Sequence, residues 1–137
     1  MPVSLVDLLL AAAAGAPGKV ALRRQQAAWT YADLTRGAAA AAMTLGTTGL
    51  QTGDRVAFLY RNGPEYVAFL YGALAARLVA VPLNVQERAS VLALQVVHSG
   101  ARLVVGDPDH PEWQALRAAL PADFPMLPVP SRDVAES

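Results

Sequence analysis

The segment spanning residues 52–84 constrains the fold of this chain most, because it carries the local signals of a strand, a helix and a second strand in that order. After a turn comes the apolar run Val56–Tyr60, which has the length of a strand buried on both faces. Asn62 can cap a helix whose first turn holds Pro64, a residue that suits this position. The shorter apolar run Leu78–Val81 predicts the second strand. A strand, a helix and a strand in this order predict a parallel pair of strands.

Helices and strands alternate along the rest of the chain. The same periodicities and caps predict a helix within Met1–Ala14, strands around Val20–Leu22 and near Trp29, helices over Tyr31–Leu45 and from Arg88 or Ser90 to Ser99, a strand over Arg102–Gly106, a helix over Asp109–Leu120 and a short strand over Met126–Val129. Helices that alternate with strands across short connections predict an α/β fold, with a mostly parallel sheet flanked by helices on both faces. The two early strands predict a small N-terminal hairpin.

Local side chains indicate where helices begin and how closely they can pack. Ser4 with Asp7, and Thr30 with Asp33, have the spacing of a capping box, in which each side chain bonds to the backbone of the other residue. The run Ala38–Ala42 consists of small residues with high helix propensity, so we expect its helix to approach a neighbour closely. The predicted organisation is one α/β subdomain over residues 1–120, followed by a proline-rich tail over residues 121–137.

Composition argues against several classes of function. Eleven basic and eleven acidic side chains give a formal net charge of zero, so the chain lacks the positive charge expected of a nucleic-acid-binding domain. The absence of cysteine excludes disulfides and thiolate sites and fits a reducing compartment, for which the cytoplasm is the expected location. No apolar stretch reaches the roughly 20 residues that a membrane-spanning helix needs, so none is predicted.

No set of residues in this sequence has the pattern of an active site. There is no glycine-rich phosphate loop and no nucleophile elbow. His98 and His110 lack ligand spacing, so no metal site is predicted, and His98 is expected to bind carbonyl groups at a helix end. Asp54 and Arg55 stand at a turn before a strand, where local hydrogen bonding is the expected role. Six aromatic residues are expected in the core by their places in strand and helix patterns: Trp29, Tyr31, Tyr60, Tyr66, Phe69 and Tyr71.

Four stretches together resemble the adenylate-forming (AMP-binding) superfamily of acyl-CoA synthetases, nonribosomal peptide adenylation domains and luciferases. Trp29–Leu34 resembles the LTYAEL motif of that superfamily, and Gly49–Ala57 resembles its GVxPGDRVA motif. Ala73–Asn84 resembles ALRAGAVVVPLN, and His98–Val105 resembles SGARxLV. The order and spacing of the motifs agree with the superfamily over roughly residues 21–107.

The resemblance implies the N-terminal subdomain of an ATP-dependent carboxylic acid ligase that works through an acyl-adenylate. In the superfamily, ATP, Mg²⁺ and CoA serve the full-length enzyme, and the phosphate loop, the nucleotide-binding motifs and a catalytic lysine all follow the region matched here. Lys19, the only lysine, lies outside any position that matches the catalytic one. We therefore expect no catalytic residue in this chain, no cofactor bound to it alone, and no activity without the remaining subdomains, supplied by the same enzyme or by a separate chain.

Two arginines depart from the pattern of the superfamily. Arg77 stands where the superfamily usually has glycine, so a left-handed backbone there would cost about 1 kcal/mol. Acyl-CoA ligases often carry Pro-Arg directly after the residue that matches Asn84, with that arginine near the CoA nucleotide, whereas here Arg88 comes later. Arg88 is therefore the one candidate cofactor-binding residue, and a solvated helix start is its alternative role.

Two further functions stay open. The first is a non-catalytic interaction module, or a split-enzyme subunit, retained from this fold to bind a partner protein. The second is an unrelated flavodoxin-like domain, which would bind its ligand at the C-terminal ends of its strands.

Overall fold

The computed structural model describes residues 4–24, 27–61 and 63–130, which group into two compact units. Unit 1 contains the described residues up to position 50 together with residues 63–77. Unit 2 contains residues 51–61 and 78–130. The segment 52–84 therefore contributes to both units, because its two strands belong to unit 2 and its helix belongs to unit 1.

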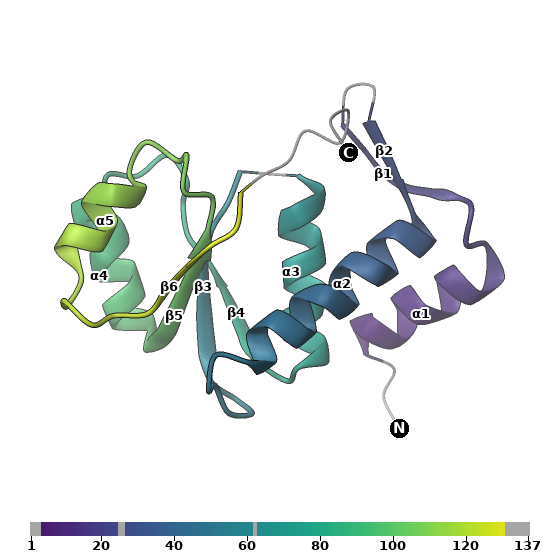
Figure 1. The fold of residues 1–137 in the computed structure, drawn as a ribbon, viewed down its shortest axis with the longest axis horizontal. Helices are drawn as coiled ribbons and strands as arrows, with labels where there is room; N and C mark the ends of the chain where they lie inside the picture. Colours follow the sequence, from purple (N-terminus) through teal and green to yellow (C-terminus); the bar gives the residue numbers. More distant parts are fainter. Residues whose placement is uncertain (1–3, 25–26, 62, 131–137) are drawn as a thin grey trace. The chain divides into compact units, whose positions relative to one another are not determined.

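Unit 2 contains a four-stranded parallel sheet (Figure 1). In spatial order its strands are β4 (Val79–Pro82), β3 (Arg55–Leu59), β5 (Ala101–Gly106) and β6 (Met126–Pro128). Each strand runs parallel to its neighbours. All of β3 after its first residue is fully buried, which confirms the prediction of a strand buried on both faces.

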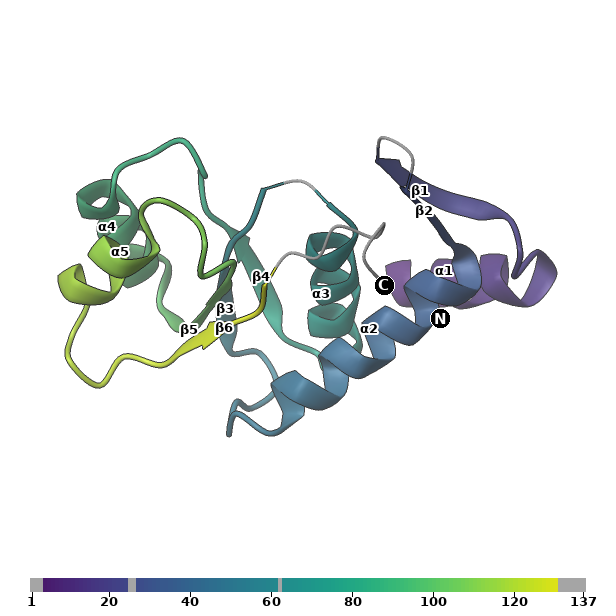
Figure 2. The ribbon, with the colours of Figure 1, turned by 45° about the horizontal axis from the view of Figure 1, so that its top comes forward.

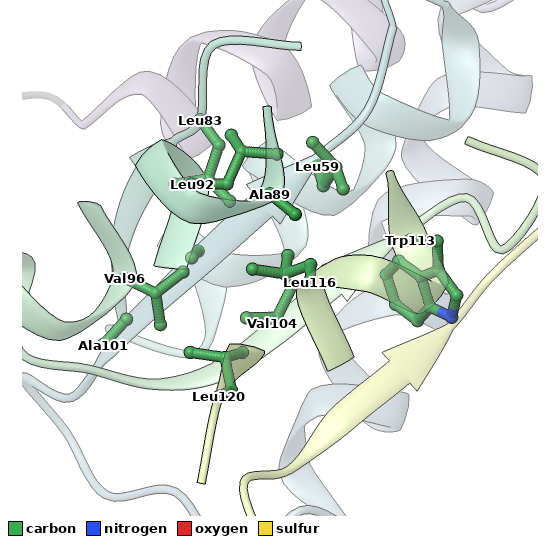
Figure 3. Packing of buried hydrophobic residues seen from close by; sticks show 11 residues of the cluster. Leu59, Leu83, Ala89, Leu92, Val96, Ala101, Val104, Trp113, Leu116 and Leu120 are labelled. Carbon is green, nitrogen blue, oxygen red and sulfur yellow. The ribbon is translucent and has the colours of Figure 1, made fainter. Parts of the chain in front are cut away.

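Two helices, α4 (Ala89–Ser99) and α5 (Trp113–Ala119), pack together over one face of this sheet (Figure 1). Figure 3 shows Leu92 of α4 and Leu116 of α5 in one apolar cluster with Val104 of β5. All three side chains are fully buried. The parallel strands and the helices that flank them confirm the predicted α/β class.

Unit 1 combines three helices with a hairpin. Its elements are α1 (Leu5–Gly15), β1 (Val20–Arg24), β2 (Ala27–Thr30), α2 (Tyr31–Gly46) and α3 (Pro64–Ala75). The strands β1 and β2 pair antiparallel, which confirms the predicted N-terminal hairpin, and Figure 2 shows the hairpin leading directly into α2. One apolar core cluster of unit 1 contains a buried residue of α1, two of α2 and one of α3, namely Leu9, Leu34, Ala38 and Ala68.

Helices α2 and α3 approach each other closely where Gly72 faces the alanine run. A Cβ atom added to Gly72 would lie 2.7 Å from the Cβ atom of Ala41 and 3.0 Å from the carbonyl oxygen of Ala38. Such distances are shorter than any ordinary van der Waals contact, so the approach requires glycine on α3. The prediction that Ala38–Ala42 allows a close helix neighbour is confirmed.

The helix ends follow the capping chemistry of the sequence at three places. The Ser4 backbone N–H donates to Asp7 Oδ2 at 3.2 Å, and the Asp7 backbone N–H donates to Ser4 Oγ at 3.1 Å. Thr30 and Asp33 form the same reciprocal pair at 2.9 Å and 3.1 Å. Gly100 ends α4 in a left-handed conformation with φ of 74°. Both predicted capping boxes and the predicted end of α4 are therefore confirmed.

The predicted start of α5 is wrong. The sequence predicts a helix from Asp109, whereas the helix begins at Trp113. Asp107 forms a turn in between, because its Oδ1 accepts the Asp109 N–H at 2.9 Å and its carbonyl oxygen accepts the His110 N–H at 3.0 Å. The prediction that Asn62 caps α3 concerns a residue outside the described ones.

The short strand predicted over residues 126–129 is present as β6. Across residues 4–24, 27–61 and 63–130, no helix has both the length and the apolar character that crossing a bilayer requires.

Candidate functional site

The carboxyl edge of the parallel sheet is the first place to seek a ligand. In the strand order β4-β3-β5-β6, the chain passes from β3 to β4 on one side and then crosses to β5 on the other side of β3. The connections therefore reverse direction between β3 and β5. Open α/β sheets bind ligands beyond the carboxyl ends of their strands at such a reversal. In this chain those ends are Leu59 of β3 and Gly106 of β5.

Close contacts join the two strand ends at this reversal point. The Asp107 N–H donates to the carbonyl oxygen of Leu59 at 3.2 Å and ties the two strand ends together. A Cβ atom added to Gly106 would lie 2.6 Å from that oxygen and 2.8 Å from a ring carbon of Trp113. Tyr60 is only 2% exposed, and its hydroxyl donates to the Val129 carbonyl oxygen at 2.7 Å. These contacts hold the ends of β3 and β5 together and pack Gly106 against Trp113.

Arg88 lies in the connection that follows β4, at the carboxyl edge of the sheet. It is the N-cap residue of α4, and its carbonyl oxygen accepts the N–H groups of Val91 at 3.0 Å and Leu92 at 2.9 Å. Its side chain makes no capping hydrogen bond and is exposed. The guanidinium is thus positioned by a helix start and presented to solvent, and a contact with CoA stays a prediction.

Asp54 and Arg55 lie at the opposite, amino edge of the sheet. Asp54 Oδ2 accepts the Gln51 N–H at 2.8 Å, which confirms the predicted local hydrogen bond. Asp54 Oδ1 also lies 3.7 Å from Arg102 Nε. The Arg55 guanidinium donates to the Ser99 carbonyl oxygen at the end of α4, a contact that is distant in sequence. Both residues bind neighbouring protein groups away from the carboxyl edge.

The two histidines have different environments. His98 is exposed in the last turn of α4, and its binding to carbonyl groups stays a prediction. His110 is 8% exposed, and its Nε2 lies 2.9 Å from the Val85 carbonyl oxygen, while its Nδ1 accepts the Glu112 N–H at 3.1 Å. His110 therefore links the connection after β4 to the connection before α5. Within the described part of the chain, no three His, Cys, Asp or Glu side chains gather as a metal site would require.

His110 is the residue whose position the sequence reveals least. Its partner Val85 lies 25 residues away, so no local spacing indicates the contact. The sequence shows only that His110 stands in a turn, after one buried strand and before a helix. That signal indicates a local hydrogen-bonding role but not its distant partner.

The aromatic residues divide between core and pocket. Tyr60 and Phe69 are buried, as predicted, and Trp29 packs partly buried against the core of unit 1. Tyr66 instead lines an open pocket of about 440 Å³ in unit 1, between β1 and the first turns of α3. Burial raises the pKa of the Tyr66 phenol above its ordinary value of 10.0, so this group stays protonated near neutral pH.

Comparison with known proteins gives one consistent family. The family model described as "AMP-binding enzyme" matches residues 9–134. A feruloyl-CoA synthase from Amycolatopsis is 38% identical over 103 residues, which are 75% of this chain and 21% of that protein. The solved complex of VinN with 3-methylaspartate gives a TM-score of 0.83 at 28% identity, over 91% of this chain and 34% of that chain. The N-terminal domain of FACL13 from Mycobacterium tuberculosis gives 0.80 at 30%, over 90% and 33%.

The lengths of these proteins differ greatly from that of the present chain. The chain spans about a fifth of the feruloyl-CoA synthase, 21%, and about a third of the two solved structures, 34% and 33%. The similarity thus concerns one region of much larger proteins.

Proposed function

Because this chain belongs to the AMP-binding enzyme family, we propose that it forms the N-terminal part of an ATP-dependent carboxylic acid ligase of the acyl- or aryl-CoA synthetase type. The observation that carries this proposal is the family match over residues 9–134, together with 38% identity to a feruloyl-CoA synthase. In the proposed reaction a carboxylate oxygen attacks the α-phosphate of ATP, which forms an acyl-adenylate and releases pyrophosphate. A thiol then takes the acyl group and AMP leaves.

The proposed role of this chain is to support a site whose reacting groups come from the remaining polypeptide. ATP, Mg²⁺ and CoA are proposed for the full-length enzyme, and no catalytic residue is proposed within this chain. The absence of cysteine supports a reducing compartment, and we place the enzyme in the cytoplasm on that ground.

An apolar stripe on α4 supports docking of the remaining polypeptide. Val91, Leu94 and Val97 are 37%, 59% and 60% exposed and recur at helical spacing, so they form one continuous surface. The helix carries no Lys, Arg, Asp or Glu between Ala89 and Ser99. Contiguous exposed apolar surface usually marks a site of interaction. We therefore place the partner, the remaining subdomains of the same enzyme or a separate chain, on this stripe.

The proposal is tested by ATP–pyrophosphate exchange with a panel of aromatic and aliphatic carboxylic acids. The chain alone should give no exchange, and addition of the polypeptide encoded after Ser137 should produce it. Exchange catalysed by the isolated chain would contradict the proposed role. Leu94→Asp should weaken reconstitution at least about tenfold by placing a charge in an apolar interface. Met43→Asp, at a 75% exposed position of α2, is the matched control and should reconstitute normally.

Arg88 is the residue of this chain that we propose lies near CoA. Its exposed guanidinium at the carboxyl edge can pair with a phosphate, as arginine does where planar anion recognition is needed. Arg88→Ala should raise the KM for CoA in the reconstituted enzyme while leaving pyrophosphate exchange unchanged. Arg117→Ala, at an exposed position of α5, is the control and should change neither quantity. An unchanged KM for CoA in Arg88→Ala would show that Arg88 does not contact CoA and serves only as the solvated start of α4.

The second candidate function is a non-catalytic interaction module. The same α4 stripe favours it, because an exposed apolar surface can bind a partner of any function. The two functions differ in the reconstitution experiment. A partner that binds at Leu94 but never restores exchange with any acid would support the module. The gene sequence after Ser137 also separates them, since a Ser/Thr/Gly-rich loop and a late lysine would support the ligase.

A further inference from the structure

The open pocket of unit 1 has the size and place of a small-molecule site. Its volume of about 440 Å³ falls within the range of roughly 300–1,000 Å³ found for ligand pockets. Strand β1 contributes Leu22 and Arg23 to its lining, and the first turns of α3 contribute the rest. Both elements belong to the same compact unit, so the pocket does not depend on how the two units are arranged.

Most of the pocket lining is apolar. Leu22, Pro64, Val67 and Leu70 contribute hydrocarbon side chains. Leu22 and Val67 also pack against the apolar core of unit 1, so this part of the lining is held in place by the fold. A surface of this kind gains free energy by covering an apolar group and removing it from water. The body of a ligand should therefore be a ring system or a hydrocarbon chain.

The polar groups of the lining favour a single negative charge. Arg23 supplies one permanent positive charge with a planar fork of donors that matches a carboxylate. Among residues 4–24, 27–61 and 63–130, no carboxylate forms an ion pair with Arg23. Gly63 and Pro64 line the pocket at the start of α3, where the helix dipole adds partial positive charge. Tyr66 adds a phenol whose neutral form burial maintains.

We propose that this pocket binds an apolar monocarboxylic acid, with the carboxylate at Arg23 and the apolar body against Leu22, Val67 and Leu70. Among the described lining residues Arg23 carries the only charge, which matches one negative charge better than the several charges of a nucleotide or a polyphosphate. The lining comes from unit 1 alone, and binding needs neither ATP nor the remaining polypeptide. It therefore does not depend on the proposed ligase function.

The test is an NMR titration of the ¹⁵N-labelled chain, without ATP, using biphenyl-4-carboxylate as the probe. Saturable shifts should concentrate on the amides of β1 and the first turns of α3. The neutral biphenyl-4-carboxamide has the same apolar body and should bind at least tenfold more weakly. Equal binding of the acid and the amide, or shifts centred on unit 2, would overturn the proposal without any variant.

Two substitutions sharpen the result. Arg23→Gln should reduce the preference for the acid over the amide at least tenfold, because it removes the charge and keeps a polar side chain of similar length. Leu70→Trp should abolish binding of both compounds by filling the pocket, with a folded spectrum as the check on structure. Arg117→Gln, at an exposed position of α5 in unit 2, is the matched control and should bind both compounds as the unmodified chain does. Unchanged acid preference in Arg23→Gln would also overturn the proposal.

Discussion

Gly72 of α3 faces Ala41 of α2 so closely that a Cβ atom at position 72 would lie 2.7 Å from the Ala41 Cβ atom. Backbone atoms of α2 lie nearly as close, with the Ala42 nitrogen at 2.9 Å and the Ala38 carbonyl oxygen at 3.0 Å. Because these backbone atoms belong to a helix, a side chain at position 72 can be accommodated only by separating α2 from α3.

Gly72→Ala should therefore destabilise unit 1. The substitution gains about 0.5–1 kcal/mol of helix propensity but costs about 1–3 kcal/mol of overpacking. The net loss in the free energy of unfolding, measured in urea, should be up to about 2.5 kcal/mol. Gly46→Ala is the control, because position 46 is also helical and a Cβ atom there would meet no other atom within 4 Å. Equal stability of the two variants would show that the helices separate without cost.

Arg77 adopts the left-handed conformation that glycine favours, with φ of 60°. Its N–H donates to the Leu74 carbonyl oxygen at 3.0 Å and closes the last turn after α3. The glycine of the superfamily motif at this position thus indicated the backbone conformation correctly, although the residue itself differs. Arginine here keeps the turn at a conformational cost of about 1–2 kcal/mol.

Arg77→Gly should raise the free energy of unfolding by up to about 1 kcal/mol, because the strain removed exceeds the extra entropy that glycine loses on folding. Arg77→Asn should give a smaller gain, since asparagine tolerates this conformation. Arg77→Ala is the control for charge and should be no more stable than the unmodified chain. A gain in Arg77→Ala equal to that in Arg77→Gly would assign the effect to the arginine charge instead.

Local chemistry explains which parts of the fold could be predicted. The Thr30–Asp33 capping box, the end of α4 at Gly100 and the buried strand β3 each depend on neighbouring residues alone, and the sequence predicts all three. The predicted start of α5 was wrong because two aspartates close in sequence can each hydrogen-bond to the backbone that follows. Asp107 makes that bond and forms a turn, and the helix begins only after the turn. Apolar periodicity does not indicate which aspartate forms the turn, because both side chains can accept a hydrogen bond from the following backbone.

Long-range relations could not be predicted. Apolar periodicity indicates that α3 is covered but not by which element, and α3 groups with α1 and α2 in unit 1. The hydrogen bond between His110 and Val85 is equally hard to predict, because it joins two loops that a helix and a strand separate in the sequence. The pocket beside Tyr66 combines a strand and a helix 40 residues apart, and an aromatic residue in a helix pattern favours the core by default.

His110 should stabilise the fold through both ring nitrogens. Its Nδ1 accepts the Glu112 N–H and therefore carries no hydrogen, so Nε2 carries it and donates to Val85. His110→Leu should lower the free energy of unfolding by about 1–3 kcal/mol, because it leaves a backbone donor and a backbone acceptor unpaired. The matched control is His98→Leu at an exposed position of α4, with an expected change within about 0.5 kcal/mol. Observation of the hydrogen on Nδ1 by ¹⁵N NMR would contradict the assignment.

Asp33 should make the stability of unit 1 depend on acid pH. Hydrogen bonds from the backbone and side chain of Thr30, with a further contribution from Arg36, hold the pKa of the Asp33 carboxyl below its ordinary value of 3.8. A carboxyl whose pKa is lower in the folded state contributes stability above its unfolded pKa and loses it as the pH falls through the folded pKa. The free energy of unfolding should therefore fall on acidification below about pH 4, and Asp33→Asn should remove part of that fall. Urea unfolding between about pH 5 and pH 2 measures this change in the free energy of unfolding. Asp123→Asn, at an exposed position before β6, is the control and should lose as much stability on acidification as the unmodified chain. If both variants show the same dependence of stability on pH, Asp33 contributes nothing to the loss.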